Sequence, residues 1–126
     1  MVVYSGTHDN DTSLGWWRNS STERERAVMQ IYLATDGNLA SWDLVRASMA
    51  SVANTAIVPA QDLLNLDSWA RMNFPGRAEG NWSWRLQPDQ LDQGLAERVR
   101  RTTLMYQRCA NPPAEAQPPA PKLPPY

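Results

Sequence analysis

The chain has 126 residues, a length that allows one modest domain with a core of its own. Its formal net charge of −1 at pH 7 points neither to nucleic acid nor to an anionic membrane as a partner. No apolar run approaches the roughly 18 residues of a membrane span, and the N-terminus shows no basic-then-apolar signal region. A single cysteine, Cys109, excludes an internal disulfide, so the sequence predicts a cytoplasmic protein.

The first informative stretch lies near the N-terminus. An apolar run at Val2–Tyr4 predicts the end of a buried strand, and polar residues follow it directly. They include the only histidine of the chain, His8, beside Asp9. Polar clusters at the carboxyl ends of strands are where α/β barrels place their chemistry. The residues alone leave open a plainer interpretation, a network of Asx turns in which Asp9, Asn10, Asp11 and Thr12 bond their own backbone.

Metal binding is a weak interpretation of this stretch. Asp9, Asp11 and Ser13 have the spacing that opens an EF-hand loop, but its sixth position is Leu14 instead of glycine. A site made by His8 and Asp9 is also weak, because adjacent side chains seldom converge and further ligands are missing. We therefore expect no metal and no cofactor.

Two helices are predicted next. Thr22 followed three residues later by Glu25 is a capping-box signal for a helix that closes at residues 36–38. A second helix is expected to begin near Ser41, and its apolar residues, spaced three and four apart as far as Val52, predict one buried face.

A second short buried strand is predicted at Ile57–Ala60, with Gln61 directly after it. Strand, helical connection and strand form a βαβ unit, in which the strands are parallel. The polar residues after the two strands should then open onto one face, which brings His8, Asp9 and Gln61 to the same rim.

The remainder of the chain is predicted to contain a loop, a helix and a tail. Residues 73–85 combine turn signals with aromatic and charged side chains, a composition typical of a functional loop. A final helix should open at Pro88 and Asp89 and reach Tyr106. Residues 111–126 are rich in proline and alanine and are expected to be disordered, which leaves residues 1–110 as the folded part.

Tryptophan is unusually frequent, with six against one phenylalanine. Trp16, Trp17, Trp82 and Trp84 lie beside polar loops in the sequence and could stack on sugar rings. Composition alone favours the filling of a core over ligand stacking.

Three motifs that occur in one order carry a family resemblance. They are Gly6-Thr7-His8-Asp9-Asn10-Asp11-Thr12, Pro59-Ala60-Gln61-Asp62-Leu63-Leu64, and a third stretch from Arg71-Met72-Asn73 through Asn81-Trp82 to Arg85. Together they resemble the C-terminal part of the 4-α-glucanotransferases, the amylomaltase or disproportionating-enzyme family (glycoside hydrolase family 77) of the α-amylase clan.

The resemblance implies an α/β fold, the C-terminal part of a (β/α)₈ TIM barrel, with Val2–Tyr4 as strand 7 and Ile57–Ala60 as strand 8. It implies transfer of α-1,4-glucan segments between maltodextrins by a retaining double displacement. In that match Asp9 is the carboxylate that stabilises the transition state, and His8 binds sugar hydroxyls. The expected substrate-binding residues are Asn10, Gln61, Asn81 and Trp82.

A whole barrel takes about 250 residues, and this chain supplies about two of its strands. In the clan the nucleophile and the acid/base precede the His-Asp turn, so we expect a C-terminal fragment that is inactive alone. Its partners would be the missing N-terminal part of the same enzyme and a maltodextrin. A non-catalytic carbohydrate-binding module and a functionless remnant are the alternative interpretations.

Overall fold

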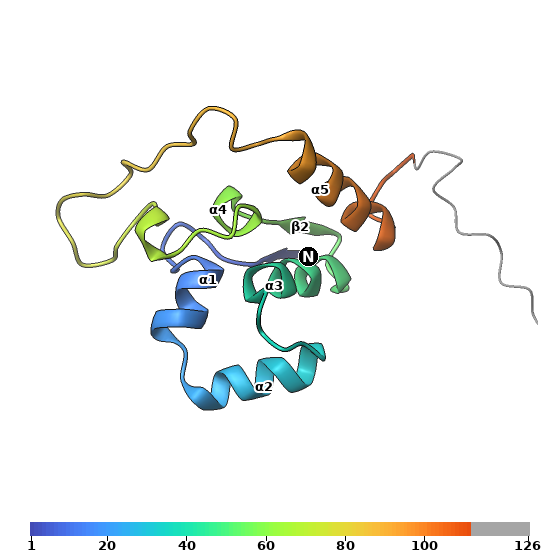
Figure 1. Cartoon of the computed structure of the whole chain (residues 1–126), viewed down its shortest axis with the longest axis horizontal. Helices are drawn as coiled ribbons and strands as arrows, with labels where there is room; N and C mark the ends of the chain where they lie inside the picture. The colour runs from blue at the N-terminus through green and yellow to red at the C-terminus, as the bar shows by residue number, and fades with distance from the viewer. Residues whose placement is uncertain (112–126) are drawn as a thin grey trace, which may run out of the picture.

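The computed structural model describes residues 1–111, so the predicted disordered tail lies outside the described residues except for Asn111. Figure 1 shows the order of the elements along the chain. They are β1 (Val2–Tyr4), α1 (Ser13–Gly15), the π-helix η1 (Trp16–Ser20), α2 (Glu23–Leu33), α3 (Ala40–Ala50), β2 (Thr55–Ile57), α4 (Ala60–Leu63), the 3₁₀ turn η2 (Ser68–Ala70) and α5 (Gln93–Met105). No helix of this described part is long and apolar enough to cross a membrane.

The sheet has two parallel strands, as the βαβ pattern predicted. β1 lies beside β2, with Val3 opposite Ala56 and Tyr4 opposite Ile57. The second strand is Thr55–Ile57 and not Ile57–Ala60, because Pro59 is already the residue before helix α4. Both strands therefore end at the same edge, and the chain turns there into the mostly polar residues 5–12 and into Gln61 and Asp62.

The prediction that these strands are buried is wrong. Val2, Tyr4 and Ile57 are each about half exposed, and in each strand only the central residue is partly covered. Alternate residues of a strand point to opposite faces, so the helices cover the face of Val3 and Ala56 and leave the other face open.

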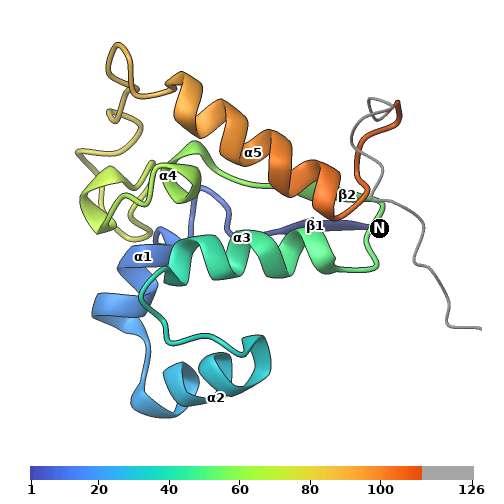
Figure 2. The same cartoon turned by 45° about the vertical axis from the view of Figure 1, so that its right-hand side comes forward.

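Helix α3 is the centre of the core. Its buried residues include Trp42 and Val45, and its neighbours are α1, α4, β2 and α5. Figures 1 and 2 show α5 running beside α3, with α2 standing apart from the rest. The Arg98 guanidinium of α5 lies 3.8 Å from the centre of the Trp42 ring, and burial there lowers the pKa of Arg98.

The predicted capping box is confirmed at the start of helix α2. Thr22 accepts a hydrogen bond from the Glu25 N–H at 3.2 Å, and Glu25 accepts one from the Thr22 N–H at 2.7 Å. The helix ends at Leu33 and not at residues 36–38, because Ala34 adopts a left-handed conformation with φ of 51°. Of the α2 side chains only Met29 is buried.

Other predicted boundaries also need correction. Val52 lies beyond the end of α3 and is exposed, so it does not extend the buried face of that helix. Helix α5 begins at Gln93 and not at Pro88, because the Asp92 carboxylate caps it by accepting from the Leu95 N–H at 2.7 Å. Trp16 and Trp17, for which the sequence predicted a place beside polar loops and no helix, begin the π-helix η1.

Candidate functional site

A buried carboxylate fixes the polar ends of both strands. Asp62 is 1% exposed, and its carboxylate accepts hydrogen bonds from Ser5 Oγ at 2.6 Å and from the N–H and Oγ of Ser13 at 2.8 Å each. Its carbonyl oxygen accepts from Ser41 Oγ at 2.7 Å. Asp62 therefore joins the end of β1 to α1, α3 and α4 and holds the intervening turn in place.

Two side chains of the turn between Ser5 and Ser13, those of Asn10 and Asp11, bond its backbone as the Asx-turn interpretation predicts. Asn10 Oδ1 accepts from the N–H of Thr7 at 2.8 Å and from its Oγ1 at 2.9 Å. Asp11 accepts from the Thr12 N–H at 2.8 Å and from Ser68 Oγ at 2.9 Å. Gly15 lies so close to this last pair that a Cβ there would overlap both side chains.

Asp9 is engaged differently. Among the described residues, its carboxylate contacts side chains and not the backbone of its turn: Oδ1 accepts from Asn73 Nδ2 at 2.7 Å, and Oδ2 lies 3.2 Å from His8 Nε2. The two adjacent side chains do converge, against the sequence-based expectation. Both remain accessible, with 53% of the His8 and 55% of the Asp9 side chain exposed.

The loop of residues 71–85 closes over the turn from the other side. The indole of Trp82 lies 5.1 Å from the His8 ring, and the backbone N–H of Trp82 donates to the Met72 carbonyl at 2.6 Å. Trp82 has a φ of 59°, a left-handed conformation that costs a bulky residue about 1–3 kcal/mol. Such strain persists only where the surroundings fix it, here the Met72 carbonyl and a 2.9 Å bond from Arg85 Nη1 to the Trp82 carbonyl.

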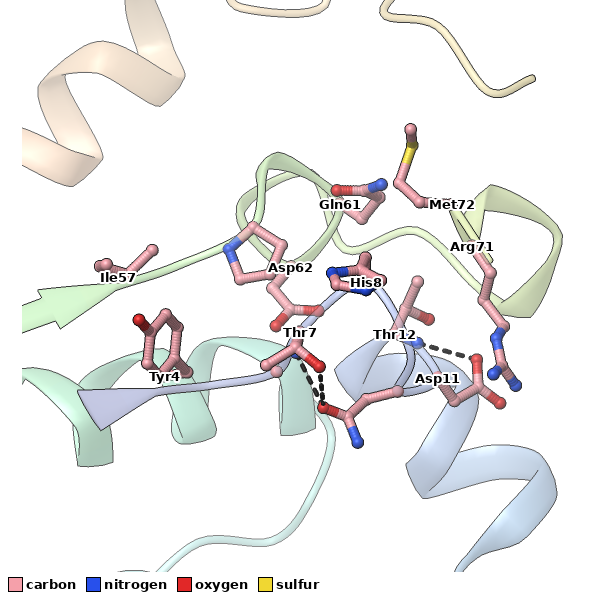
Figure 3. Close-up of a pocket in the computed structure, with 13 residues that line it drawn as sticks. Tyr4, Thr7, His8, Asp11, Thr12, Ile57, Gln61, Asp62, Arg71 and Met72 are labelled. Carbon is pink, nitrogen blue, oxygen red and sulfur yellow. Dashed lines mark hydrogen bonds between the residues drawn. The ribbon is translucent and has the colours of Figure 1, made fainter. Parts of the chain in front are cut away.

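Two adjoining pockets flank the His-Asp turn. One has a volume of about 540 Å³ and is lined by His8, Gln61, Asp62 and Met72 among others, as Figure 3 shows. The second, of about 560 Å³, is lined by Asp9, Trp16 and Ser20 among others. Tyr4, Thr7, Asn10 and Arg71 line both, so the turn presents His8 to one side and Asp9 to the other.

The structure brings the predicted site residues together, but several amides are already bonded within the fold. Gln61 is buried, and its Nε2 donates to the Ala70 carbonyl at 3.1 Å. Asn81 accepts from the Phe74 N–H and donates to the Arg77 carbonyl, both at 2.8 Å, which closes the loop on itself. Asn10 holds the turn through its Oδ1. His8, Asp9, Asn10 and Trp82 are the exposed members of the set, whereas Gln61 is buried and Asn81 is partly covered.

Sequence reasoning assigned no role to three residues that shape the site. Asp62 lies in the second motif of the family resemblance, and its burial could not be read from that position. Arg71 and Asn73 lie in a quoted motif, but their bonds to Asp9 span more than 60 residues of chain. Nothing local to either residue signals such a contact.

One carboxyl group beside the site, that of Asp67 before η2, has a shifted pKa. Donation from the Ser68 N–H lowers the pKa of the Asp67 carboxyl; burial opposes this shift, and Arg18 and Asn19 add smaller contributions that lower the pKa. Ser68 is also the residue whose Oγ donates to Asp11, so an ionised Asp67 supports the turn indirectly. Across the described residues 1–111, no group of three or more His, Cys, Asp or Glu side chains is placed to hold a metal ion.

Fold and site together define a mixed α/β chain whose polar cluster lies at the carboxyl ends of parallel strands. Residues 1–92 match the family model described as 4-alpha-glucanotransferase. The chain is 49% identical over 106 residues to the 4-alpha-glucanotransferase of Thermus thermophilus, an alignment that covers 79% of this chain and 21% of that protein. A chloroplastic/amyloplastic 4-alpha-glucanotransferase of Solanum tuberosum is 40% identical over 112 residues, or 86% of this chain and 19% of that protein.

A solved structure, the amylomaltase from Streptococcus agalactiae in complex with acarbose, matches with a TM-score of 0.80 and 32% identity. That match covers 86% of this chain and 22% of the amylomaltase. The chain therefore belongs to the 4-α-glucanotransferase family. It spans about a fifth of the length of the curated relatives it matches.

Proposed function

We propose that the chain contributes the His-Asp turn and its covering loop to a 4-α-glucanotransferase that transfers α-1,4-glucan segments between maltodextrins. One observation carries the proposal: Asp9 is a half-exposed carboxylate at the carboxyl ends of two parallel strands. His8 and Asn73 orient it, and in the described structure it accepts no hydrogen bond from the backbone of its own turn. The family membership supplies the reaction class, a retaining double displacement.

Asp9 would stabilise the transition state in this reaction. A carboxylate that hydrogen-bonds hydroxyls of the sugar being cleaved binds more strongly as positive charge develops on the ring, so it lowers the barrier and not merely the ground state. His8 would donate to a neighbouring hydroxyl. Trp82, which is half exposed and lies against His8, offers a flat apolar face to a sugar ring.

The three predicted amide residues would take secondary parts. Asn10 would present its Nδ2, since its Oδ1 holds the turn. Gln61 would present its Oε1 to the pocket that it shares with His8, since its Nε2 is bonded to Ala70. Asn81 would act on substrate through the shape of the loop that it closes.

We further propose that residues 1–110 are the C-terminal portion of a (β/α)₈ barrel, with β1 and β2 as its strands 7 and 8. The parallel pairing, the helical connection and the open inner face support this placement. The nucleophile and the acid/base would then come from the N-terminal part of the enzyme, which is the partner required for activity. A cytoplasmic location stays a prediction from the sequence.

The test is a reconstituted enzyme in which the 126-residue chain replaces the matching fifth of the Thermus thermophilus relative. We expect it to disproportionate maltotriose, with glucose and longer maltodextrins as products, and we expect the 126-residue chain alone not to do so. Asp9→Asn should keep the shape but lose the charge, which by analogy with loss of one oxyanion-hole donor lowers kcat about 10²- to 10³-fold.

Asp36→Asn is the matched control, because Asp36 is exposed in the connection between α2 and α3 and should leave kcat unchanged. Longer glucans made by the chain alone would show that the missing carboxylates are wrongly assigned. Normal turnover by the Asp9→Asn enzyme would show that the His-Asp turn is only structural.

A further inference from the structure

The orientation of Asp9 depends on a loop far away in the sequence. Asn73 Nδ2 donates to Asp9 Oδ1 at 2.7 Å, the short distance of a charge-assisted hydrogen bond. Since His8 Nε2 contacts the other oxygen at 3.2 Å, the two oxygens have different partners and the plane of the carboxylate is fixed. An ionised carboxylate offers about four lone-pair sites, so acceptors remain for substrate hydroxyls.

Arg71 fixes the backbone on both sides of this bond. Its Nη2 donates to the Asp9 carbonyl at 3.1 Å, and its Nε donates to the Asn73 carbonyl at 3.2 Å. The same guanidinium lies 4.7 Å from the centre of the Phe74 ring, which holds its plane. The rigid guanidinium of Arg71 therefore sets the distance between Asn73, which donates, and Asp9, which accepts.

We propose that Asn73 and Arg71 are positioning residues for the Asp9 carboxylate. Asn73 sets the rotation of the carboxylate, and Arg71 sets the register between the His-Asp turn and the loop. This inference rests on the proposed function, because it assumes that Asp9 acts on the sugar. Half of the Asp9 side chain is exposed, so without Asn73 the carboxylate would sample other rotamers and meet the transition state less often in the right geometry.

The first test compares substitutions at Asn73 in the reconstituted enzyme. Asn73→Ala removes the donor and should lower kcat about 10- to 100-fold, the effect of misplacing a reacting group, while KM for maltotriose changes less than about 2-fold. Asn73→Gln keeps an amide donor and should recover part of the loss. Asn54→Ala, at an exposed asparagine before β2, is the matched control and should leave kcat unchanged.

Arg71 has a closely matched control in the same loop. Arg71→Lys replaces a planar group that bonds two carbonyls with a point donor, so it should lower kcat by a similar factor. The Arg77 guanidinium also lies over the Phe74 ring, at 4.4 Å, but it is not bonded to Asp9 or Asn73 in the described structure. Arg77→Lys should therefore leave kcat unchanged.

Asn73→Asp gives a readout that a merely structural role would not move. It places a second carboxylate against Asp9, with Arg71 and His8 as the other charged or titratable groups facing the pair. Two carboxylates that share a site hold one proton more tightly, and the introduced carboxyl group can donate to Asp9 only while it is protonated. The optimum of kcat against pH should shift to more acid pH than in the unsubstituted enzyme.

The outcomes separate this inference from the proposed function. An inactive unsubstituted enzyme, or a fully active Asp9→Asn enzyme, would count against the proposed function itself. If Asp9→Asn is strongly impaired while Asn73→Ala and Arg71→Lys keep normal kcat, Asp9 does not need Asn73 and Arg71 to position it, and the inference is wrong. Equal losses in Arg71→Lys and Arg77→Lys would likewise show that only packing on Phe74 matters.

Discussion

Two aspartates at the carboxyl end of the sheet, Asp62 and Asp9, differ in burial and in hydrogen bonding, and these differences give them different roles. Asp62 is 1% exposed and its carboxylate accepts three hydrogen bonds, which leaves little room for a ligand. Asp9 is half exposed, and its two partners leave acceptor sites free. The same side chain therefore serves as a structural anchor in one case and as a candidate sugar-binding group in the other.

Asp62→Ala should strongly destabilise the fold. The substitution leaves the Ser13 N–H and two serine hydroxyls without their acceptor, and hydrogen bonds to a charged group contribute about 1.5–3 kcal/mol each. We expect the free energy of unfolding, measured with urea on the reconstituted enzyme, to fall by about 3 kcal/mol or more.

Asp62→Asn is the graded comparison. Its Oδ1 can still accept from the Ser13 N–H, and the serine hydroxyls can turn to accept from the new amide. It should therefore lower the free energy of unfolding clearly less than Asp62→Ala does. Glu79→Gln, at an exposed loop carboxylate, should change nothing. An Asp62→Ala protein as stable as the Glu79→Gln control would show that Asp62 is not the anchor of this region.

At the scale of elements, the sequence predicted those that local patterns specify. The capping box of α2, the apolar face of α3 and the parallel pairing of β1 with β2 all follow from neighbours along the chain. The short elements α1, η1 and α4 were not predicted, because contacts between distant residues hold them in place. Ser13 at the start of α1, for example, donates to Asp62 across 49 positions.

The same division applies to the candidate site. The sequence identified His8 and Asp9 from a family motif, and the structure places them on one turn with Trp82 against them. It could not reveal that Asn73 and Arg71 reach Asp9, or that Gln61 and Asn81 bond backbone carbonyls, since each of these contacts depends on the tertiary fold. Burial of the strands was wrongly predicted because apolar residues face an open side of the sheet.

Helix α2 should respond to pH through its cap. Donation by the N–H of Thr22, and then by its hydroxyl, lowers the pKa of Glu25 below its ordinary value of 4.5. Because the pKa of Glu25 is lower in the folded state, this stabilisation is fully present above that ordinary value and is lost as the pH falls through the folded pKa. NMR signals of residues 23–33 should therefore show the helix fraying first in acid.

Glu25→Gln removes the titrating group, so fraying of α2 should become independent of pH in the acid range. Thr22→Ala removes the side chain that accepts from the Glu25 N–H and donates to the Glu25 carboxylate, so it should destabilise the helix by about 0.5–2 kcal/mol at neutral pH. Acid fraying that persists unchanged in Glu25→Gln would assign the pH dependence to another group.

At the scale of the whole molecule, the open face of the sheet is the dominant feature. Val2, Tyr4 and Ile57 are about half exposed on it, and β1 and β2 have no further strand beside them in the described structure. Unpaired strand edges and exposed apolar faces promote association with other chains. In a barrel the same residues would face the interior and be covered by the remaining strands.

The 126-residue chain alone should accordingly be marginally stable and self-associating. We expect a broad thermal transition by circular dichroism and a mass above the monomer by light scattering, both dependent on concentration. The double substitution Tyr4→Thr with Ile57→Thr places β-branched residues, which suit a strand, at both positions and removes apolar surface from the open face, so it should reduce association without lowering the melting temperature. Val3→Thr is the matched control on the opposite face: Val3 lies on the face that the helices cover, so this substitution should lower stability and leave association unchanged.

A sharp, concentration-independent transition in a monomer would show that two strands and their helices suffice for a stable fold, and the need for a covering partner would be refuted.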